Sequence, residues 1–405
     1  MRVTGKATHT ISAPRRVALQ VLAAVAQGAY AADELQERSH PLDPRDAALA
    51  TQLVFGCLRY QNQLDFLISH YSGRPAARLD EPVRLALRLA IFQIRYLERI
   101  PARAAVNESV EFVKTACRSA AGFVNAVLRK VNRNSVAWRS REVELSCPEW
   151  LLARWTGHFG EDPARGIARA ALAEPVAYLR IAPGSPLPEE LELAPTSVPG
   201  AWRLSGGGHG LRLHDIGSQS IVPLLEIRPG DRYLDLCAAP GNKTLQALEY
   251  APELAVACDI SFRRLREMPP VCPRVVLDAT EPLPFAGPFD RVFIDAPCSG
   301  TGTLARNPEI KWRLEAGDLT RFAERQQQIL LRGAEVLGKN GRLLYATCSL
   351  EREENEDVIR WFLAAHPQFR LMKEQWRLPG RDEGDGFYAA VLERYAEACA
   401  IARPF

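Results

Sequence analysis

The spacing of hydrophobic residues divides the chain into parts, and the first part is helical. Apolar side chains such as Leu85, Leu89 and Phe92 recur at intervals of three and four residues, which places them on one face of a helix. Together with acidic-Pro pairs that mark helix starts, this spacing predicts an all-helical region over residues 14–135. The five helices, joined by short connections, are expected around Val17–Val25 and at residues 47–69, 83–98, 104–116 and 122–131.

From about residue 212 onward, short apolar runs alternate with amphipathic segments. Apolar runs of four to seven residues are typical of buried strands, and the segments between them have helical spacing. Such alternation indicates an α/β domain with a doubly wound, mostly parallel sheet and helices on both faces. The strands are expected at residues 233–236, 254–258, 274–277, 291–294, 342–346 and 387–393. The helices are expected at residues 243–250, 262–267, 319–337 and 353–365.

The segment between these two regions has a mixed pattern. Residues 148–173 have amphipathic helical spacing, and residues 177–182 alternate like a strand. Residues 183–210 are rich in Pro and Gly, which indicates loops and short strands. We therefore expect three domains. They are a helical domain over residues 1–140, a linker with a small α+β subdomain over 141–215, and the sheet domain over 216–405.

Composition narrows the class of protein. The 405 residues are 47% hydrophobic and 24% charged, which is ordinary for a globular protein. No run approaches the ~18 apolar residues of a membrane span, and the first residues lack the apolar core of a secretory signal. The nine cysteines are scattered without a CxxC pair, which argues against disulfides and a zinc site. We expect a cytoplasmic protein without a membrane or metal partner.

Positive charge is concentrated at the amino-terminal end. Residues 1–140 contain 20 Lys and Arg against 11 Asp and Glu, a net charge of +9, whereas the remainder has a net charge of −6. Only seven of the 51 basic residues are Lys, and Arg suits bidentate contacts with phosphate. A basic domain of this kind is typical of a protein that binds a polyanion. The alternative is that these arginines only occupy solvent-exposed helix faces and bind nothing.

Two predicted strands end in loops that each contain a cysteine. The apolar run that ends at Ile294 leads into Asp295 and then Cys298, within FIDAPCSGTGTLARNPEIKW. The run that ends at Ala346 leads into Cys348, within LLYATCS. In open α/β sheets, ligands bind at this carboxyl edge of the strands. A single cysteine of this kind would be read as a small buried hydrophobe, but two indicate thiol chemistry.

A third loop has the features of a cofactor site. The segment YLDLCAAPGNKT runs from a strand through small residues to a helix start. Small side chains let a ligand approach the backbone closely. Asp259 lies about 20 residues further on, a usual position for a carboxylate that binds a ribose, and Asp278 ends the third strand. These acids could instead be helix caps. Three successive strand-end acids ahead of the thiol loops favour a nucleoside cofactor.

These motifs resemble those of the RNA cytosine-5 methyltransferases of the RsmB/Fmu (NOL1/NOP2/Sun) family. The resemblance rests on DLCAAPGNKT, on DAPCSGTGTLARNPEIKW and on ATCS followed by EREENE. The segments LRLHDIGSQS and GDGFY also match, and the helical third resembles the NusB-like RNA-binding domain of these proteins. The resemblance implies a Rossmann-like methyltransferase domain with S-adenosylmethionine as cofactor, preceded by an all-α NusB-like domain.

The resemblance also assigns roles to individual residues. It makes Cys348 the nucleophile and Cys298 the cysteine that helps release the product. From the chemistry of the reaction, we expect Asp295 to hydrogen-bond the N3/N4 edge of the cytosine and Lys243 to lower the pKa of a thiol or hold the base. The sequence alone leaves open which thiol attacks, because DNA cytosine methyltransferases use the Pro-Cys thiol. Asn242 stands where the family has Gly, and we expect the loop to tolerate Asn because Asn accepts left-handed backbone conformations. The cofactor-binding positions implied are Cys237, Ala238, Ala239, Pro240, Gly241, Asn242, Lys243, Asp259, Asp278 and Asp295.

The expected substrate is small-subunit (16S) ribosomal RNA, and we expect the enzyme to act as a monomer. The small α+β subdomain of the segment 141–215 is predicted to bind RNA. Arg306, Asn307 and Lys311, after the Cys298 loop, are predicted to steer the RNA backbone. Two alternatives remain: a methyltransferase for tRNA or, less readily, DNA, and an RNA-binding factor whose methyltransferase fold is only a scaffold. A scaffold would have no use for the two cysteines.

Overall fold

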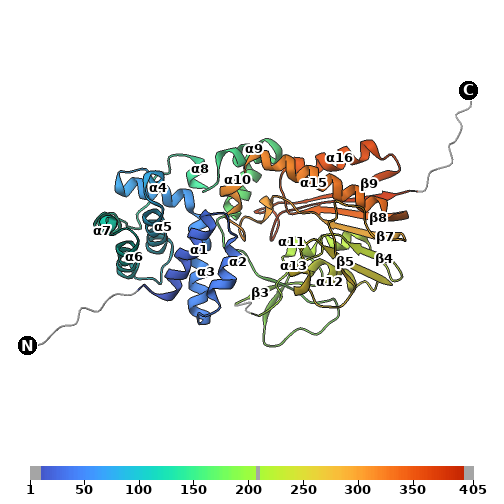
Figure 1. Ribbon diagram of the computed structural model, residues 1–405, viewed down its shortest axis with the longest axis horizontal. Helices are drawn as coiled ribbons and strands as arrows, with labels where there is room; N and C mark the ends of the chain where they lie inside the picture. Colours follow the sequence, from blue (N-terminus) through green and yellow to red (C-terminus); the bar gives the residue numbers. More distant parts are fainter. Residues whose placement is uncertain (1–10, 207–209, 396–405) are drawn as a thin grey trace, which may run out of the picture. The chain divides into compact units, whose positions relative to one another are not determined.

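The computed structural model describes residues 11–206 and 210–395, and within them the chain forms two compact units. One unit contains the residues up to Ala173 together with the segment Leu304–Arg313, and the other contains the remainder. Figure 1 shows the elements of both units in the colours of the sequence. The predicted middle segment 141–215 is therefore divided between the units, and its residues 207–209 lie outside the described ranges.

The first unit is helical, as predicted. The predicted helix at residues 47–69 is in fact two helices, because the backbone departs from helical geometry at Tyr60. A further short helix, α2, was not predicted because only Ala31 and Leu35 of its nine residues are buried, too few for an apolar stripe. Up to Ala173, the described helices are α1 (Ala13–Ala26), α2 (Ala31–Ser39), α3 (Pro44–Arg59), α4 (Gln61–Ser72), α5 (Glu81–Tyr96), α6 (Ala102–Ala116), α7 (Ala121–Leu128), α8 (Arg141–Glu144), α9 (Glu149–Phe159) and α10 (Glu161–Ala170).

A buried polar connection joins three helices inside this apolar bundle. The Nε atom of Arg15, on α1, donates a 2.7 Å hydrogen bond to Oε1 of Gln93, on α5. The same guanidinium forms a 2.7 Å ion pair with Glu108, on α6. Because Gln93 is fully buried and Arg15 almost so, losing any partner would leave a polar group without compensation in an apolar core. The connection therefore fixes the relative positions of the three helices.

The segment Leu304–Arg313 follows the Cys298 loop in the sequence but packs within the helical unit. Lys311 is 1% exposed, and its Nζ donates a 3.0 Å hydrogen bond to the carbonyl oxygen of Arg59. The indole nitrogen of Trp312 likewise donates to the carbonyl oxygen of Leu58, at 2.7 Å. The prediction that Lys311 steers RNA is therefore wrong, because its ammonium group is used inside the unit to satisfy a backbone carbonyl.

Burial of Lys311 should make the free energy of unfolding depend on pH. Burial lowers its pKa from 10.5 to about 8, against a smaller opposing effect of Cys147. Between about pH 8 and 10.5 the unfolded chain therefore binds a proton that the folded chain does not, so folding stability should rise with pH. Relative to Lys311→Met, the wild-type free energy of unfolding should gain up to about 3 kcal/mol over this range. Denaturant titrations at several pH values measure the difference.

The matched control for this titration is Lys114→Met, which removes a half-exposed lysine on α6. Its stability difference from the wild type should change little between pH 7 and 10.5, because this side chain is half-exposed to solvent in the folded chain. An equal pH dependence for both variants would contradict the prediction for Lys311.

The second unit is built on a seven-stranded sheet that confirms the predicted α/β class. Its order is β6-β5-β4-β7-β8-β10-β9. The strands from β6 to β8 are parallel, and β10 is antiparallel to both of its neighbours. All six predicted strands are present. The strands are β4 (Arg232–Asp235), β5 (Leu254–Asp259), β6 (Arg274–Val276), β7 (Phe289–Asp295), β8 (Leu337–Thr347), β9 (Phe369–Arg377) and β10 (Phe387–Arg394).

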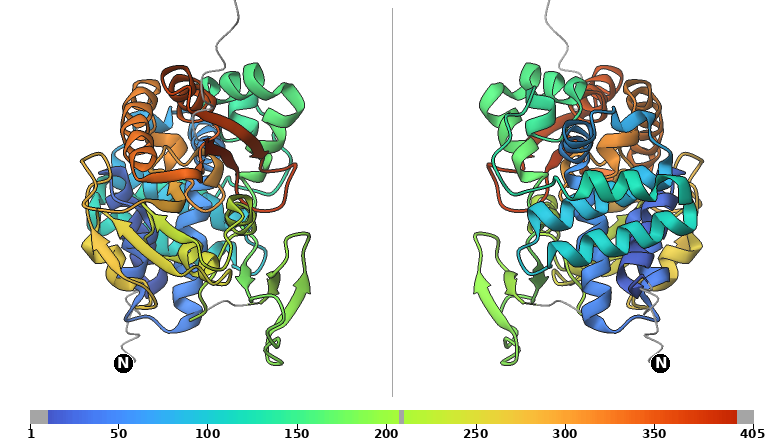
Figure 2. Two further views of the ribbon diagram at one scale, coloured as in Figure 1. Left: turned by 90° about the vertical axis from the view of Figure 1, so that its right-hand side faces the viewer. Right: turned by 90° about the vertical axis from the view of Figure 1, so that its left-hand side faces the viewer.

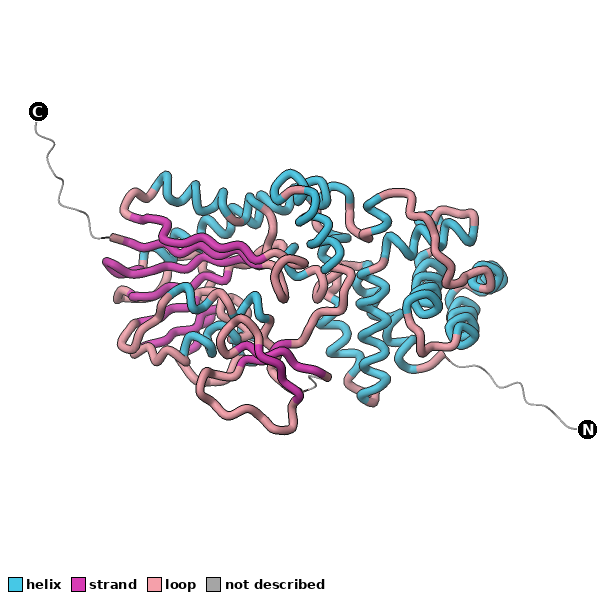
Figure 3. Tube along the Cα trace, turned by 180° about the vertical axis from the view of Figure 1, so that it is seen from behind, coloured by secondary structure: helices cyan, strands magenta, loops and turns pink. Residues whose placement is uncertain are grey.

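Helices cover both faces of the sheet, as Figure 3 shows. Alternate residues of each strand point to opposite faces, so Leu234 packs toward α15 (Ala316–Glu335) and α16 (Glu356–Ala365), whereas Tyr233 packs on the side of α12 (Asn242–Leu248). Helix α13 (Phe262–Glu267) lies over Ala257 on this second face. The apolar core thus consists of two layers, one on each side of the sheet.

Two strand features were not predicted in full. β9 was missed because it is an edge strand with mostly exposed residues, so it lacks the alternation that marks a half-buried strand. The predicted strand at 177–182 forms the edge of a separate sheet with the order β1-β3-β2. Figure 2 shows this small sheet, in light green, apart from the large one. Its strands are β1 (Tyr178–Arg180), β2 (Glu192–Pro195) and β3 (Ala201–Ser205).

Candidate active site

The candidate site lies where the order of strands reverses. From β4 the chain proceeds outward to β5 and β6, then returns to β7 and β8 on the other side of β4. The helices that follow β4 and β7 therefore leave in opposite directions, and a crevice opens at the carboxyl ends of these strands. The Cys237–Lys243 loop follows β4, and Asp295 is the last residue of β7. The predicted site residues therefore meet at one edge of the sheet.

Buried hydrogen bonds hold the loop after β4. Asp235 is 1% exposed, and its carboxylate accepts hydrogen bonds from the hydroxyl of Thr244, at 2.6 Å, and from the backbone N–H of Cys237, at 3.3 Å. Burial raises the pKa of Asp235 to about 7, against the opposing effect of its hydrogen bond from Thr244. The carboxylate thus ties the strand end to the start of α12.

The loop's left-handed turn falls on Gly241 and not on Asn242. Gly241 has a φ of +103°, and a Cβ atom there would lie 2.5 Å from the Cγ atom of Met268, so this position requires glycine. Asn242 instead begins α12, and its side-chain amide donates a 2.9 Å hydrogen bond to the carbonyl oxygen of Leu213. The loop tolerates Asn242 because that position is helical, a different reason from the predicted one.

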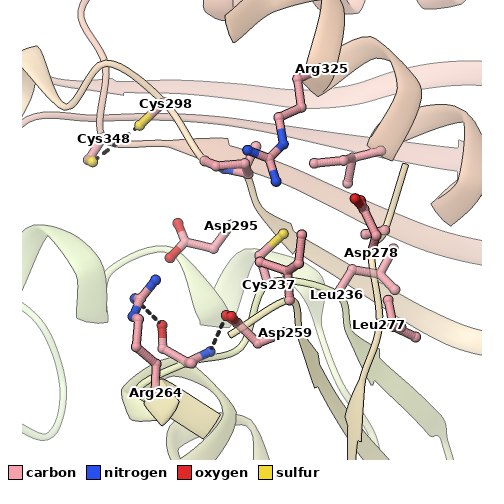
Figure 4. Close-up of a pocket in the computed structure, with 16 residues that line it drawn as sticks. Leu236, Cys237, Asp259, Arg264, Leu277, Asp278, Asp295, Cys298, Arg325 and Cys348 are labelled. Atoms are coloured by element: carbon pink, nitrogen blue, oxygen red, sulfur yellow. Dashed lines mark hydrogen bonds between the residues drawn. The ribbon is translucent and has the colours of Figure 1, made fainter. Parts of the chain in front are cut away.

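A cavity of about 370 Å³ extends from this loop to the two cysteines. Three of the predicted acids, Asp259, Asp278 and Asp295, line it together with small and apolar side chains (Figure 4). From the loop, Cys237 and Ala239 line the cavity. The other predicted residues of this segment are not part of the lining: Ala238, Pro240, Gly241, Asn242 and Lys243.

Two of the acids also organise the backbone around the cavity. The Oδ2 atom of Asp259 accepts a 3.1 Å hydrogen bond from the backbone N–H of Ala239, and Oδ1 accepts one from Ser261. The Oδ1 atom of Asp278 accepts from both the backbone N–H and the hydroxyl of Thr280, and these bonds lower its pKa. Because each carboxylate oxygen can accept two hydrogen bonds, both acids keep capacity for a ligand.

Asp295, which lines the cavity, forms an ion pair with Lys243. The Nζ atom of Lys243 lies 2.7 Å from Oδ2 of Asp295 and 5.2 Å from the centre of the Phe387 ring. Burial by itself would lower the pKa of Lys243, but the charge and hydrogen bond of Asp295 outweigh it and raise that pKa. Lys243 therefore remains charged, with the negative character of Cys348 also favouring its cation.

The two predicted cysteines are in contact. The Sγ atoms of Cys298 and Cys348 lie 3.3 Å apart at the end of the cavity (Figure 4). This contact and burial raise the pKa of Cys298 well above its usual value, and the charges of Cys348, Glu354 and Asp295 add to the effect. Cys298 therefore keeps its proton more firmly than an ordinary cysteine does.

A glycine brings the two cysteine loops together. The backbone N–H of Gly302 donates a 2.8 Å hydrogen bond to the carbonyl oxygen of Cys348, and its own carbonyl accepts one from Gly386. A Cβ atom on Gly302 would lie 2.5 Å from the carbonyl oxygen of Gly386. Only glycine fits, because backbone atoms on both sides cannot give way.

Sequence reasoning missed several residues around the cavity. Arg264, on α13, lines the cavity and donates a 2.6 Å hydrogen bond to the carbonyl oxygen of Ala239 (Figure 4). Arg325, on α15, extends into it from the opposite wall. No local sequence pattern marks Arg264 or Arg325 as a site residue, since each looks like any other charged residue on a helix. Glu354 belongs to the EREENE segment that contributed to the resemblance, but the sequence gave it no role.

Comparison with known proteins agrees with this architecture. Residues 222–393 match the family of 16S rRNA methyltransferases RsmB/F, and residues 12–133 match the NusB family. Ribosomal RNA small subunit methyltransferase B of Thermus thermophilus is 35% identical over 94% of this chain and 98% of its own length.

Solved structures show the same fold. The crystal structure of PH0851 has a TM-score of 0.77 at 23% identity and covers 94% of this chain and 98% of its own. NSun6 of Pyrococcus horikoshii has a TM-score of 0.53 at 17% identity and covers 62% of this chain and 99% of its own. Both confirm the predicted fold class. By its similarity to the Thermus thermophilus protein over nearly the whole length of both, this chain belongs to the RsmB family of ribosomal RNA small subunit methyltransferases and contains a NusB-family helical domain.

Proposed function

We propose that this protein methylates C5 of a cytosine in small-subunit (16S) ribosomal RNA, with S-adenosylmethionine as the methyl donor and a covalent bond between a cysteine sulfur and C6 of the base. The observation that carries the proposal is the pair of thiols in contact at the end of an acid-lined cavity, with the Lys243–Asp295 ion pair nearby. Each of these groups has a use in that chemistry.

The cavity fits the proposed cofactor. S-adenosylmethionine, when bound, supplies a methyl group on a positively charged sulfonium. Asp259 and Asp278 retain free acceptor capacity, so they can bind ribose hydroxyls and the adenine amino group. The short side chains of Cys237 and Ala239 leave room beside the backbone.

The environments of the two thiols support different roles. Cytosine C5 becomes nucleophilic only after a thiolate has added to C6, which is covalent catalysis by an activated nucleophile. We assign the attack to Cys348, because Cys298 is held as a neutral thiol by its raised pKa. Lys243, whose cation is favoured by Cys348, can stabilise the thiolate in return.

Release of the product follows from the same contact. A base removes the proton from C5, the C5–C6 double bond re-forms, and the bond between C6 and the Cys348 sulfur breaks. Part of the rise in the pKa of Cys298 comes from Cys348 itself. That part disappears once Cys348 is bound to the ring, so Cys298 can then pass its proton to solvent water, and the resulting thiolate can act as the base that accepts the C5 proton. Asp295 can hydrogen-bond the N3/N4 edge of the cytosine.

The partner in this proposal is RNA. Support comes from the net charge of +9 over residues 1–140 and from the NusB-family match to residues 12–133. The target base must leave its stack to reach the thiols. Action as a monomer in the cytoplasm stays a prediction. Within the described residues, no helix has the length and apolar character needed to span a membrane, and no group of three or more His, Cys, Asp or Glu side chains is arranged to hold a metal ion.

Alanine variants of the two cysteines test the proposed roles. Cys298→Ala should accumulate a covalent protein–RNA adduct, because it can attack but not release. Cys348→Ala should form no adduct and lose at least about 1,000-fold in methyl transfer, since covalent catalysis is abolished. A denaturing gel with 16S ribosomal RNA, and transfer of a labelled methyl group, measure these outcomes.

The opposite pattern, with adduct accumulating in Cys348→Ala, would exchange the two roles. If no variant forms an adduct and the wild type transfers no methyl group to ribosomal RNA, the proposed reaction is contradicted. Cys117→Ala is a suitable control because Cys117 is a free cysteine of the helical unit, outside the cavity. It should behave like the wild type.

A second variant tests the cofactor site at Asp278. Asp278→Ala should weaken S-adenosylmethionine binding about tenfold or more, because a hydrogen bond to a charged acceptor contributes about 1.5–3 kcal/mol. Glu281→Ala removes a nearby exposed acid outside the cavity lining and should leave the affinity unchanged. Isothermal titration calorimetry measures both. Equal affinities for Asp278→Ala and the wild type would exclude Asp278 from the cofactor site.

A further inference from the structure

A buried carboxylate lies directly behind the two cysteines. Glu354, just before α16, is 0% exposed and accepts four hydrogen bonds, two on each oxygen. Its Oε2 atom accepts from the backbone N–H of Ser299, at 2.8 Å, and from Nε2 of Gln326, at 2.9 Å. Its Oε1 atom accepts from the hydroxyl of Ser349, at 2.5 Å, and from that of Ser299.

These donors are the residues that immediately follow the two thiols. Ser299 follows Cys298, and Ser349 follows Cys348, so one carboxylate binds both cysteine loops at the nearest possible position in the chain. The two serine hydroxyls are also 3.0 Å from each other. Gln326, on α15, donates a second hydrogen bond, 3.0 Å long, to the carbonyl oxygen of Pro297, on the other side of Cys298. The Cys298 loop is thus held on both sides of the cysteine.

Glu354 itself is fixed by its surroundings. The hydroxyl of Tyr345, on β8, donates a 2.6 Å hydrogen bond to the backbone carbonyl of Glu354. The next residue, Asn355, accepts a 2.6 Å hydrogen bond from the hydroxyl of Thr347 and donates a 3.0 Å one to the carbonyl oxygen of Ser349. The backbone that carries Glu354 is therefore anchored to β8, the strand that leads into Cys348.

The donors around Glu354 are neutral. Its carboxylate is bound by two hydroxyls, one amide and one backbone N–H, and no Lys or Arg pairs with it among the ion pairs of the described residues. Burying such a group costs free energy unless its hydrogen bonds are complete. An apolar side chain would be enough if this position only filled the core. A carboxylate here is useful because it can accept hydrogen bonds from several donors at once.

We propose that Glu354 is a positioning residue for the methyl-transfer reaction, which holds the Cys298 and Cys348 loops together through Ser299 and Ser349 so that the two thiols stay in contact. It touches neither the cavity nor the sulfur atoms, and it acts through the serines. The part of this inference that concerns catalysis rests on the proposed function. The part that concerns the distance between the thiols does not.

The conservative variant separates hydrogen bonding from charge. In Glu354→Gln, the amide oxygen can accept from Ser299 N–H and Gln326, while the amide NH₂ donates to the two hydroxyls, which can accept as well as donate. The bridge is then complete without a charge. In Glu354→Ala the bridge is lost. Asp357→Ala is the matched control, since it removes an acid three residues away, on α16, that pairs with Arg360 in a largely exposed ion pair.

The thiol contact is measured first, without RNA. Dibromobimane becomes fluorescent when it joins two thiols that lie close together, and the Cys348→Ala protein gives the background from other cysteines. Glu354→Ala should slow the Cys298–Cys348 reaction at least about tenfold, since it releases both loops. Glu354→Gln and Asp357→Ala should react within about twofold of the wild type. S-adenosylmethionine affinity should be unchanged in all three, because Glu354 does not line the cavity.

Methyl transfer to 16S ribosomal RNA is measured second. Glu354→Ala should lower kcat about 100-fold with little change in KM for RNA, as expected for displaced reacting groups, and Glu354→Gln should stay within about fivefold. An unchanged crosslinking rate in Glu354→Ala overturns the proposal, and so does a glutamine variant as impaired as the alanine variant. If wild type transfers no methyl group, the proposed function fails while the crosslinking result still decides the role of Glu354.

If Glu354→Ala fails to bind cofactor and is therefore misfolded, the double variant Ser299→Ala/Ser349→Ala replaces it. This variant keeps the carboxylate's bonds to Ser299 N–H and Gln326 but removes both hydroxyls. Its crosslinking rate should fall at least about fivefold. An unchanged rate with normal cofactor affinity overturns the proposal.

Discussion

The site depends on two parallel neighbouring strands, β7 and β8, which end at the same edge of the sheet. Their register pairs Asp295 with Ala346, so the loops that follow begin side by side although their cysteines are 50 residues apart. The hydrogen bond between Gly302 and Cys348 and the bridge through Glu354 then set the final distance between the thiols. Backbone pairing between the strands brings the two thiols to the same edge of the sheet, and hydrogen bonds of buried polar groups then set the distance between them.

Electrostatics around the two sulfurs follow from this arrangement. Their contact and burial hold Cys298 in its protonated form, while the cation of Lys243 lies on the side of Cys348, anchored by Asp295. The neighbours of Cys298 thus raise its pKa above that of an ordinary thiol.

The sequence predicted the sheet domain well, because its strands and helices carry strong periodic signals. It missed α2 and β9 because most of their residues are exposed, so neither segment has an apolar pattern of its own. Contacts with neighbouring elements determine their secondary structure. It placed Lys311 against RNA, because a lysine in a loop looks solvent-accessible, whereas the segment Leu304–Arg313 packs within the helical unit. The loop accommodates Asn242 as expected, but the reason is that this position is helical and not that Asn adopts a left-handed conformation.

By itself, the sequence determined the α/β class, the NusB-like helical domain and the residues that converge at the strand ends, since these depend on local periodicity and short motifs. The tertiary structure alone decided the 3.3 Å contact of the thiols, the raised pKa of Cys298 and the four hydrogen bonds to Glu354. Distances, burial and charge effects of this kind arise between residues far apart in the chain. No local pattern records them, because they depend on which strands become neighbours and how the loops between them pack.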